Sequence, residues 1–235
     1  MENTPDFFDL ENLAFFCKVN ASISHELKNI MAIISETAGL LTDISEMAGK
    51  GSPIELDMLT ESTQSIVEEI QRGFTTIRQM NRFSHSIDTP IVSIDLRKIL
   101  DLVSHLLGYL SFSGEICVHP VEEDVPMALT CPFILQTIIY EAAAHIFRIG
   151  GVETKLNIHL RPKGDSAWQI IFDGLNTTHL ESFPDESLER IAASIGVTIK
   201  CNPDTDSLDI EVPVSPQTLV AYSESSDTPV GKNNA

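Results

Sequence analysis

The chain has 235 residues, of which 43% are hydrophobic, and a formal net charge of −19 at pH 7. This length can form one large domain or two modest ones with a sizeable core. Nucleic acids and anionic membrane surfaces attract clusters of lysine and arginine. A chain this acidic is therefore expected to bind neither. No apolar run approaches the roughly 20 residues that are needed to span a bilayer.

The N-terminal and cysteine patterns favour a soluble, cytoplasmic protein. Residues 1–10 are acidic and lack the basic and apolar regions of a signal peptide. The cysteines form neither a CxxC motif nor a metal-ligand pattern, so we expect reduced and mostly buried thiols. They are Cys17, Cys117, Cys131 and Cys201.

Two long helices are predicted, over residues 9–48 and 53–87. Glycine, serine and proline at residues 49–53 separate them. The apolar residues at helical spacing are Ile23, Leu27, Ile30, Ile34, Leu41 and Ile44 in the first helix, and Leu59, Ile66, Ile70, Phe74, Ile77 and Phe83 in the second. A single antiparallel pair of such long helices cannot cover both stripes. We therefore expect a homodimer in which two hairpins form a four-helix bundle.

The remainder of the chain mixes helices with strands. Helices are predicted over residues 95–109, 132–147 and 187–194, and strands over 115–121, 155–161, 168–173, 198–201 and 208–212. Segregated helices and antiparallel strands favour an α/β sandwich, so the predicted fold class is α+β. We assign residues 1–90 to the helical hairpin, 91–214 to the sandwich and 215–235 to a mobile polar tail.

Residues 24–29, Ser-His-Glu-Leu-Lys-Asn, place a histidine on the first long helix. His25 and Asn29 are about one turn apart and project from the same face. Glu26 lies about 100° further round the axis. Because the apolar stripe occupies another face, we expect His25 at the exposed rim, where an imidazole beside a carboxylate can act as a nucleophile.

The element order and these residues together resemble the core of a sensor histidine kinase, over about residues 12–214. That core is a helical-hairpin dimerisation and histidine-phosphotransfer domain, followed by an ATP-binding domain. Residues 24–29 look like its phosphoacceptor box, residues 93–96 like its linker, and residues 135–139 like the start of its ATP-site helix. The resemblance implies that His25 carries a phosphoryl group. Receiver domains of response regulators are the implied partners, and a sensor kinase is a further candidate partner.

The sequence departs from that family at the nucleotide site. His145 stands where the family has a magnesium-coordinating asparagine, and the adenine motif Asp-x-Gly-x-Gly is reduced to Asp173-Gly174-Leu175-Asn176. A second glycine-rich motif is missing, and the segment that follows Gly174 is too short for a lid over a nucleotide. Phosphates bind to backbone N–H groups that glycine exposes, together with cations. We therefore expect a degenerate ATP-binding-like domain that binds neither ATP nor another cofactor.

A phosphoacceptor histidine without its own ATP site resembles the dimeric histidine phosphotransferases of phosphorelays. These proteins move phosphoryl groups between aspartates of response regulators. His25 is then the nucleophile, and Glu26 is expected to accept a hydrogen bond from the second ring nitrogen. Lys28 could neutralise phosphoryl oxygens, and the magnesium ion is expected on the receiver domain.

Asn29 leaves dephosphorylation of the regulator open as a second activity, because phosphatase-competent kinases of the family use an amide at this position to orient water. Two further functions stay open: a divergent histidine kinase, and a non-catalytic dimeric adaptor of two-component signalling. Glu141 and His145 are spaced like a metal pair, but no third ligand is in view, so a structural pair is favoured. Receiver contacts are expected near His25, at Ser22, Ile23, Glu26, Asn29, Met31 and Ala32.

Overall fold

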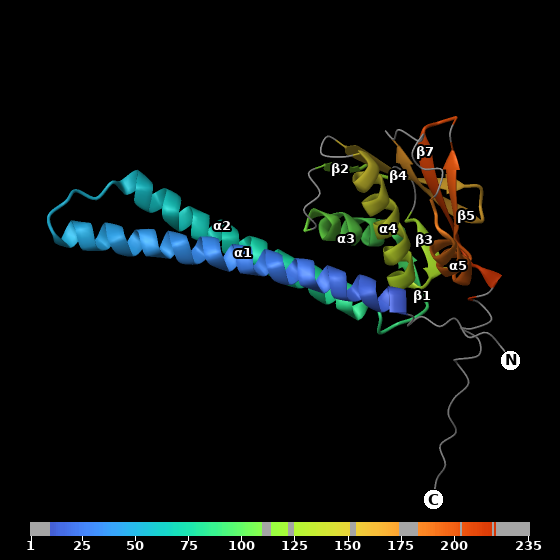
Figure 1. Cartoon of the computed structure of the whole chain (residues 1–235), viewed down its shortest axis with the longest axis horizontal. Coiled ribbons are helices and arrows are strands. Elements are labelled where there is room, and N and C mark those ends of the chain that lie inside the picture. The colour runs from blue at the N-terminus through green and yellow to red at the C-terminus, as the bar shows by residue number, and fades with distance from the viewer. Residues whose placement is uncertain are drawn as a thin grey trace, which may run out of the picture. The chain divides into compact units, whose positions relative to one another are not determined.

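Figure 1 shows the computed structural model of the chain. The structure describes residues 10–109, 114–121, 125–150, 154–173, 183–202, 204–217 and 219. They fall into two compact units, one formed by Phe16–Arg82 and the other by the described residues before Phe16 and from Phe83 onward. The predicted α+β class, a helical hairpin followed by a mixed sheet domain, is confirmed.

The first unit is an antiparallel helical hairpin. Its helices are α1 (Leu10–Gly49) and α2 (Leu56–His85), whose outer ends continue into the second unit (Figure 1). The turn after α1 contains Gly51 with a φ of 94°, a conformation that glycine adopts without steric cost. Among the described helices, none combines the length and the hydropathy that a bilayer-spanning segment requires.

The two helices bury side chains of different kinds in the hairpin. On α1, Ile23 and Ile30 are fully buried, as the helical spacing predicts. The inward face of α2 is instead small and polar; its buried residues are Ser62, Gly73, Thr76 and Gln79. Most of the apolar residues of α2 consequently remain exposed, in contrast to the stripe of α1.

The second unit is a two-layer α/β sandwich. Its larger sheet has the strand order β2-β4-β5-β7-β6, with β2 parallel to β4 and the other pairs antiparallel. The strands are β2 (Glu115–Val118), β4 (Lys155–Lys163), β5 (Ala167–Asp173), β6 (Thr198–Asn202) and β7 (Ser207–Pro213). Leu156, Ile158 and Leu160 of β4 are buried in alternation, so one face of the sheet packs against helices. These helices are α3 (Leu96–Gly108), α4 (Pro132–Gly150) and α5 (Glu186–Ser194).

A second, two-stranded sheet is formed by β1 (Val92–Asp95) and β3 (Met127–Thr130), which pair antiparallel. The sequence did not predict these strands, because four residues are too few to show an alternating pattern. β2 is also shorter than predicted and ends at Val118.

Helix α4 forms the centre of the sandwich and is buried on almost every side. From Pro132 to Phe147, only Glu141 and His145 are not fully buried. The ring of Phe15 lies 5.8 Å from that of Phe133 and 4.8 Å from that of Tyr140, measured between ring centroids. Phe83 packs in the same cluster, 5.9 Å from Phe133. The first residues of α1 and the last of α2 therefore belong to the core of this unit.

The expectation of mostly buried cysteines is wrong. None of these four described cysteines forms a disulfide; Cys17 and Cys117 are exposed, Cys201 is half-buried, and Cys131 alone is buried. Burial raises the pKa of the Cys131 thiol to about 11, so this thiol is protonated at neutral pH.

Asp95 caps the N-terminus of α3. Its carboxylate accepts the backbone N–H of Arg97 at 3.0 Å, and its Oδ2 lies 2.8 Å from Nη2 of the same residue. The side-chain hydrogen bond from Arg97 lowers the pKa of Asp95 below its ordinary value of 3.8. The cap is therefore ionised at neutral pH and holds the first turn of the helix.

Asp95→Ala should lower the free energy of unfolding by about 0.5–2 kcal/mol at pH 7, the usual cost of losing such a cap. Because the folded-state pKa of Asp95 is depressed, its ionic contribution is complete above pH 3.8 and disappears as the pH falls through the folded value. The difference between wild type and variant should therefore shrink below pH 3.8. Urea unfolding followed by fluorescence of Trp168, the single tryptophan of the chain, measures it. A difference that grows on acidification would contradict this assignment.

Candidate functional site

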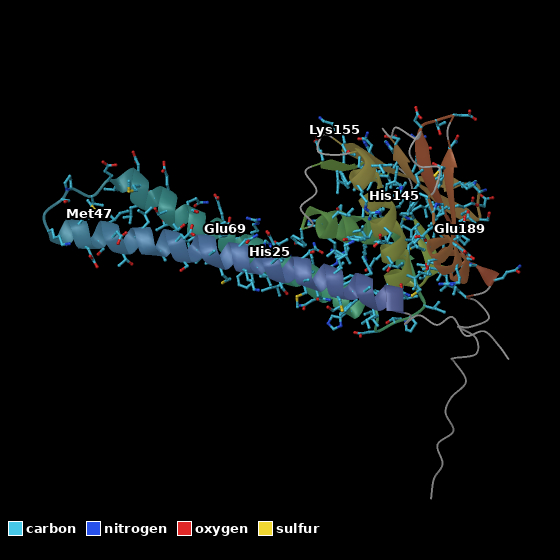
Figure 2. The ribbon with its side chains drawn as sticks, viewed as in Figure 1. His25, Met47, Glu69, His145, Lys155 and Glu189 are labelled. Atoms are coloured by element: carbon cyan, nitrogen blue, oxygen red, sulfur yellow. The ribbon has the colours of Figure 1, made fainter. Side chains whose placement is uncertain are left out.

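His25 lies on α1 and is exposed to solvent, as the sequence predicts. Ile23 and Ile30 form the buried face of this helix, and His25 lies about 140–160° round the axis from both. Figure 2 shows His25 on α1 and Glu69 on α2, with Glu69 nearer the turn of the hairpin. The imidazole is thus available to a partner, while the helix that carries it is anchored on its opposite side.

Asn29 contacts the imidazole of His25. Its Nδ2 lies 3.3 Å from the ring Nδ1, one turn back along α1. An amide side chain that turns by 180° presents its oxygen in place of its nitrogen, so Asn29 can donate to Nδ1 or accept from it. When Asn29 accepts, the ring proton is on Nδ1 and the lone pair is on Nε2. In that state the exposed nitrogen is the nucleophilic one.

Glu26 is placed differently from the expectation. Among the described residues, no hydrogen bond joins His25 to Glu26. The Glu26 carboxylate instead forms an ion pair with Nη2 of Arg72, on α2. The Glu26 side chain is 12% exposed and that of Arg72 is 49% exposed. Glu26 therefore holds a guanidinium beside the histidine, rather than hydrogen-bonding to the ring itself.

Arg72 is a residue of this site that the sequence analysis missed. It comes from a different helix, and no spacing rule connects it to residues 24–29. Its Nη1 also lies 3.4 Å from both carboxylate oxygens of Glu69, one turn away on α2. The antiparallel pairing of the helices brings Arg72 to α1, because the next residue, Gly73, faces Ile30.

The other predicted site residues are exposed or half-buried, with one exception. Lys28 and Asn29 are exposed, as are the expected docking residues Met31 and Ala32, and Ser22 is half-buried. Ile23 is fully buried against the hairpin, so the expectation that it contacts a partner is wrong. Helical periodicity places Ile23 in the buried apolar stripe, and this indication is stronger than its nearness to His25 in the sequence.

The charges of the hairpin are segregated along its length. The stretches that flank the His25 level, residues 16–29 and 72–82, contain Glu26 as their single acidic residue. Their basic residues are Lys18, Lys28, Arg72, Arg78 and Arg82. The acidic residues of the hairpin beyond this level are Glu36, Asp43, Glu46, Glu55, Asp57, Glu61, Glu68 and Glu69. The end of the hairpin that carries His25 is thus locally basic in a chain of strongly negative charge.

His145 lies on α4, at the position where the resemblance to sensor histidine kinases implies a magnesium-coordinating asparagine. Its ring stacks on that of Phe183, with centroids 4.6 Å apart and planes at 27°. Burial lowers the pKa of His145, so the imidazole is neutral at pH 7. In the described ranges, no three ligating side chains come together in a way that could hold a metal ion. Residues 174–176 of the reduced adenine motif lie outside the described residues.

Histidine kinases are among the solved structures that resemble this chain. One is Acinetobacter baumannii histidine kinase AdeS, at 12% sequence identity and a TM-score of 0.40, over 81% of this chain and 98% of that one. Another is the ATP binding domain of PrrB from Mycobacterium tuberculosis, at 16% identity and a TM-score of 0.41, over 55% of this chain and all of that one.

A third is histidine kinase ThkA in complex with response regulator protein TrrA, at 15% identity and a TM-score of 0.41, over 88% of this chain and 64% of that one. No protein-family model matches the sequence, and no curated protein sequence matches it. The solved neighbours belong to the class that the sequence resembles.

Proposed function

We propose that this protein is a histidine phosphotransfer protein of two-component signalling. His25 accepts a phosphoryl group from the aspartyl phosphate of one receiver domain and passes it to an aspartate of another. The observation that carries this proposal is an exposed imidazole, hydrogen-bonded through Nδ1 to Asn29 and flanked by a carboxylate–guanidinium pair. Phosphoryl transfer requires mainly positioning and neutralisation of charge, which such a group of side chains can provide.

In the transfer step, the lone pair of His25 Nε2 attacks phosphorus while the bond between phosphorus and the aspartate oxygen breaks. The electrons of that bond leave with the receiver's carboxylate. The ring proton stays on Nδ1, where Asn29 accepts it in a hydrogen bond and stabilises the positive ring. Transfer to a second receiver reverses the same step. The magnesium ion of the reaction belongs to the receiver domain, and the chain itself needs no cofactor.

We infer that the sandwich unit does not supply the phosphate from ATP. The aromatic ring of Phe183 stacks on His145, at the position of the expected magnesium ligand. A neutral, partly buried imidazole in such a stack is poorly placed to complete a magnesium site, which prefers oxygen ligands. The reduced glycine motifs of the sequence agree with this inference.

We also infer that the protein acts as a homodimer. The outward face of α2 carries exposed apolar side chains at alternating spacings of three and four residues: Val67, Ile70, Phe74 and Ile77. Such spacing forms a continuous stripe along a helix, and an apolar stripe of this length is normally covered by a partner helix. Two hairpins joined along α2 would cover it in a four-helix bundle.

Incubation with ³²P-labelled receiver domains from the same genome tests the proposed function. Label that moves to this chain and is acid-labile but base-stable supports a phosphohistidine. Retention of the label by every receiver domain, or its release as inorganic phosphate alone, would contradict phosphotransfer. Release alone would instead favour dephosphorylation of the regulator, a second candidate function that the exposed amide of Asn29 beside the histidine supports.

Asn29→Ala should slow transfer to His25 about 2- to 10-fold, because a hydrogen bond between neutral groups contributes about 0.5–1.5 kcal/mol. Single-turnover transfer from a phosphorylated receiver domain measures the rate. Ser24→Ala is the matched control, since Ser24 is an exposed residue of the same turn region and no contact with the ring involves it. Equal rates for both variants would rule out a role for Asn29 in setting the tautomer.

A further inference from the structure

Arg72 forms an ion pair with Glu26, the residue that follows His25, and it comes from the opposite helix. We propose that Arg72 anchors the phosphoryl group at this site, exchanging the carboxylate of Glu26 for phosphoryl oxygens when a receiver domain docks. This inference rests on the proposed phosphotransfer function and adds to it the residue that binds the transferred group.

The contacts of Arg72 leave it able to bind an additional anion. Nη2 pairs with Glu26, while the contacts of Nη1 with Glu69 are long, at 3.4 Å. A guanidinium has five N–H donors, and 49% of this side chain is exposed, so donors remain available to solvent. The two carboxylates hold the guanidinium in place before phosphate binds. This preorganisation reduces the entropic cost of phosphate binding.

The position of Arg72 follows from its partner. Glu26 is the next residue after His25 and lies about 100° round α1 from it, so a guanidinium paired with Glu26 lies on the flank of α1 next to the histidine. α1 thus supplies the nucleophile and α2 supplies the cation.

A cation is needed here because three phosphoryl oxygens share negative charge during transfer. Arg72 suits this role better than Lys28. Its planar fork can bind two phosphoryl oxygens at once, whereas an ammonium is a single, strongly hydrated point charge. The basic residues of α1 near His25, Lys18 and Lys28, further favour the approach of a phosphate and of an acidic receiver pocket.

During the step, the guanidinium forms no covalent bond and transfers no proton. Its N–H groups move from the Glu26 carboxylate to two oxygens of the phosphoryl group, while the N–P bond forms at His25 and the P–O bond to the aspartate breaks. Glu26 then lies beside the positive phosphoimidazole ring and balances its charge.

The test compares Arg72→Gln, Arg72→Lys and Arg78→Gln in the full chain, by single-turnover transfer at increasing concentrations of a phosphorylated receiver domain. Arg78 is an exposed arginine of the same helix, so its replacement makes an equal change in net charge. We expect Arg72→Gln to lower the maximal transfer rate about 10- to 100-fold, as for a lost hydrogen bond to a charged group. Arg72→Lys should retain part of the rate, and Arg78→Gln should stay within about twofold of wild type. Added guanidinium ion should restore part of the rate of Arg72→Gln and leave Arg78→Gln unchanged.

Equal rates for Arg72→Gln and Arg78→Gln would overturn the proposal and leave the proposed function intact. The proposal would also be overturned if Arg72→Gln lost transfer rate and melting temperature together and guanidinium did not restore the rate. The role of Arg72 would then be structural. Absence of label from wild-type His25 would overturn both the anchor and the phosphotransfer function. The Arg72 side chain is 49% exposed, so its replacement leaves no cavity in the hairpin and the variants should fold.

Discussion

Replacing His25 by alanine should reduce phosphoryl transfer from receiver domains to background, with no change in thermal unfolding. The imidazole is exposed, so its removal leaves no cavity in the hairpin. It supplies the only atom that forms the bond to phosphorus in the proposed step, so its loss cannot be compensated by Asn29 or Arg72. Transfer of ³²P from a labelled receiver domain, followed over time on denaturing gels, measures the effect.

The control for His25→Ala is His85→Ala, which removes another exposed histidine, near the end of α2, where it pairs with Asp88. This control should transfer at the wild-type rate. Undiminished labelling of His25→Ala would show that another residue accepts the phosphate. Loss of label in vitro combined with full signalling by His25→Ala in cells would favour the alternative of an adaptor that acts by occupancy.

Replacing Phe74 by glutamate should convert the proposed dimer into a monomer. Phe74 is 58% exposed on a single hairpin and lies at the centre of the stripe formed by Val67, Ile70, Phe74 and Ile77. Burial of one such side chain contributes about 1.5–3 kcal/mol, and a two-fold symmetric interface contains it twice. The dissociation constant should therefore rise at least about 100-fold, and more where the new carboxylate is left unpaired.

Sedimentation velocity over a range of protein concentrations distinguishes the two states. Thr75→Glu is the matched control, because Thr75 is adjacent in sequence but about 100° further round the helix, away from the stripe. It adds the same charge and should remain dimeric. A wild-type protein that sediments as a monomer, or a Phe74→Glu variant that remains dimeric, would show that the stripe is not the subunit interface.

The long helices and the general order of the sandwich could be predicted from the sequence because they depend on local signals. Helical periodicity extends over many turns in residues 10–49, and the break at Gly49–Pro53 is made of residues with a specific conformational role. The exposure of His25 could be predicted for the same reason, since the buried stripe through Ile23 and Ile30 leaves the histidine on the other side.

What the sequence could not reveal depends on pairing between distant segments. The ion pair of Glu26 with Arg72 exists because the register of two antiparallel helices brings them to one level, and helix periodicity does not determine this register. The same applies to the polar inward face of α2, where Thr76 and Gln79 are buried while Ile70 and Phe74 are exposed. Hydrophobic spacing located the apolar residues of α2, but it did not show that the hairpin leaves most of them exposed.

The source of the phosphoryl group tests the central claim most directly. Wild-type protein is incubated in parallel with [γ-³²P]ATP and magnesium, and with a ³²P-labelled receiver domain, and the labelled residue is identified by peptide mapping at neutral to basic pH. We predict label on His25 from the receiver domain and none from ATP. Label on His25 from ATP alone would identify a divergent histidine kinase. If neither ATP nor the receiver domain labels His25, a phosphoacceptor role for this histidine is contradicted.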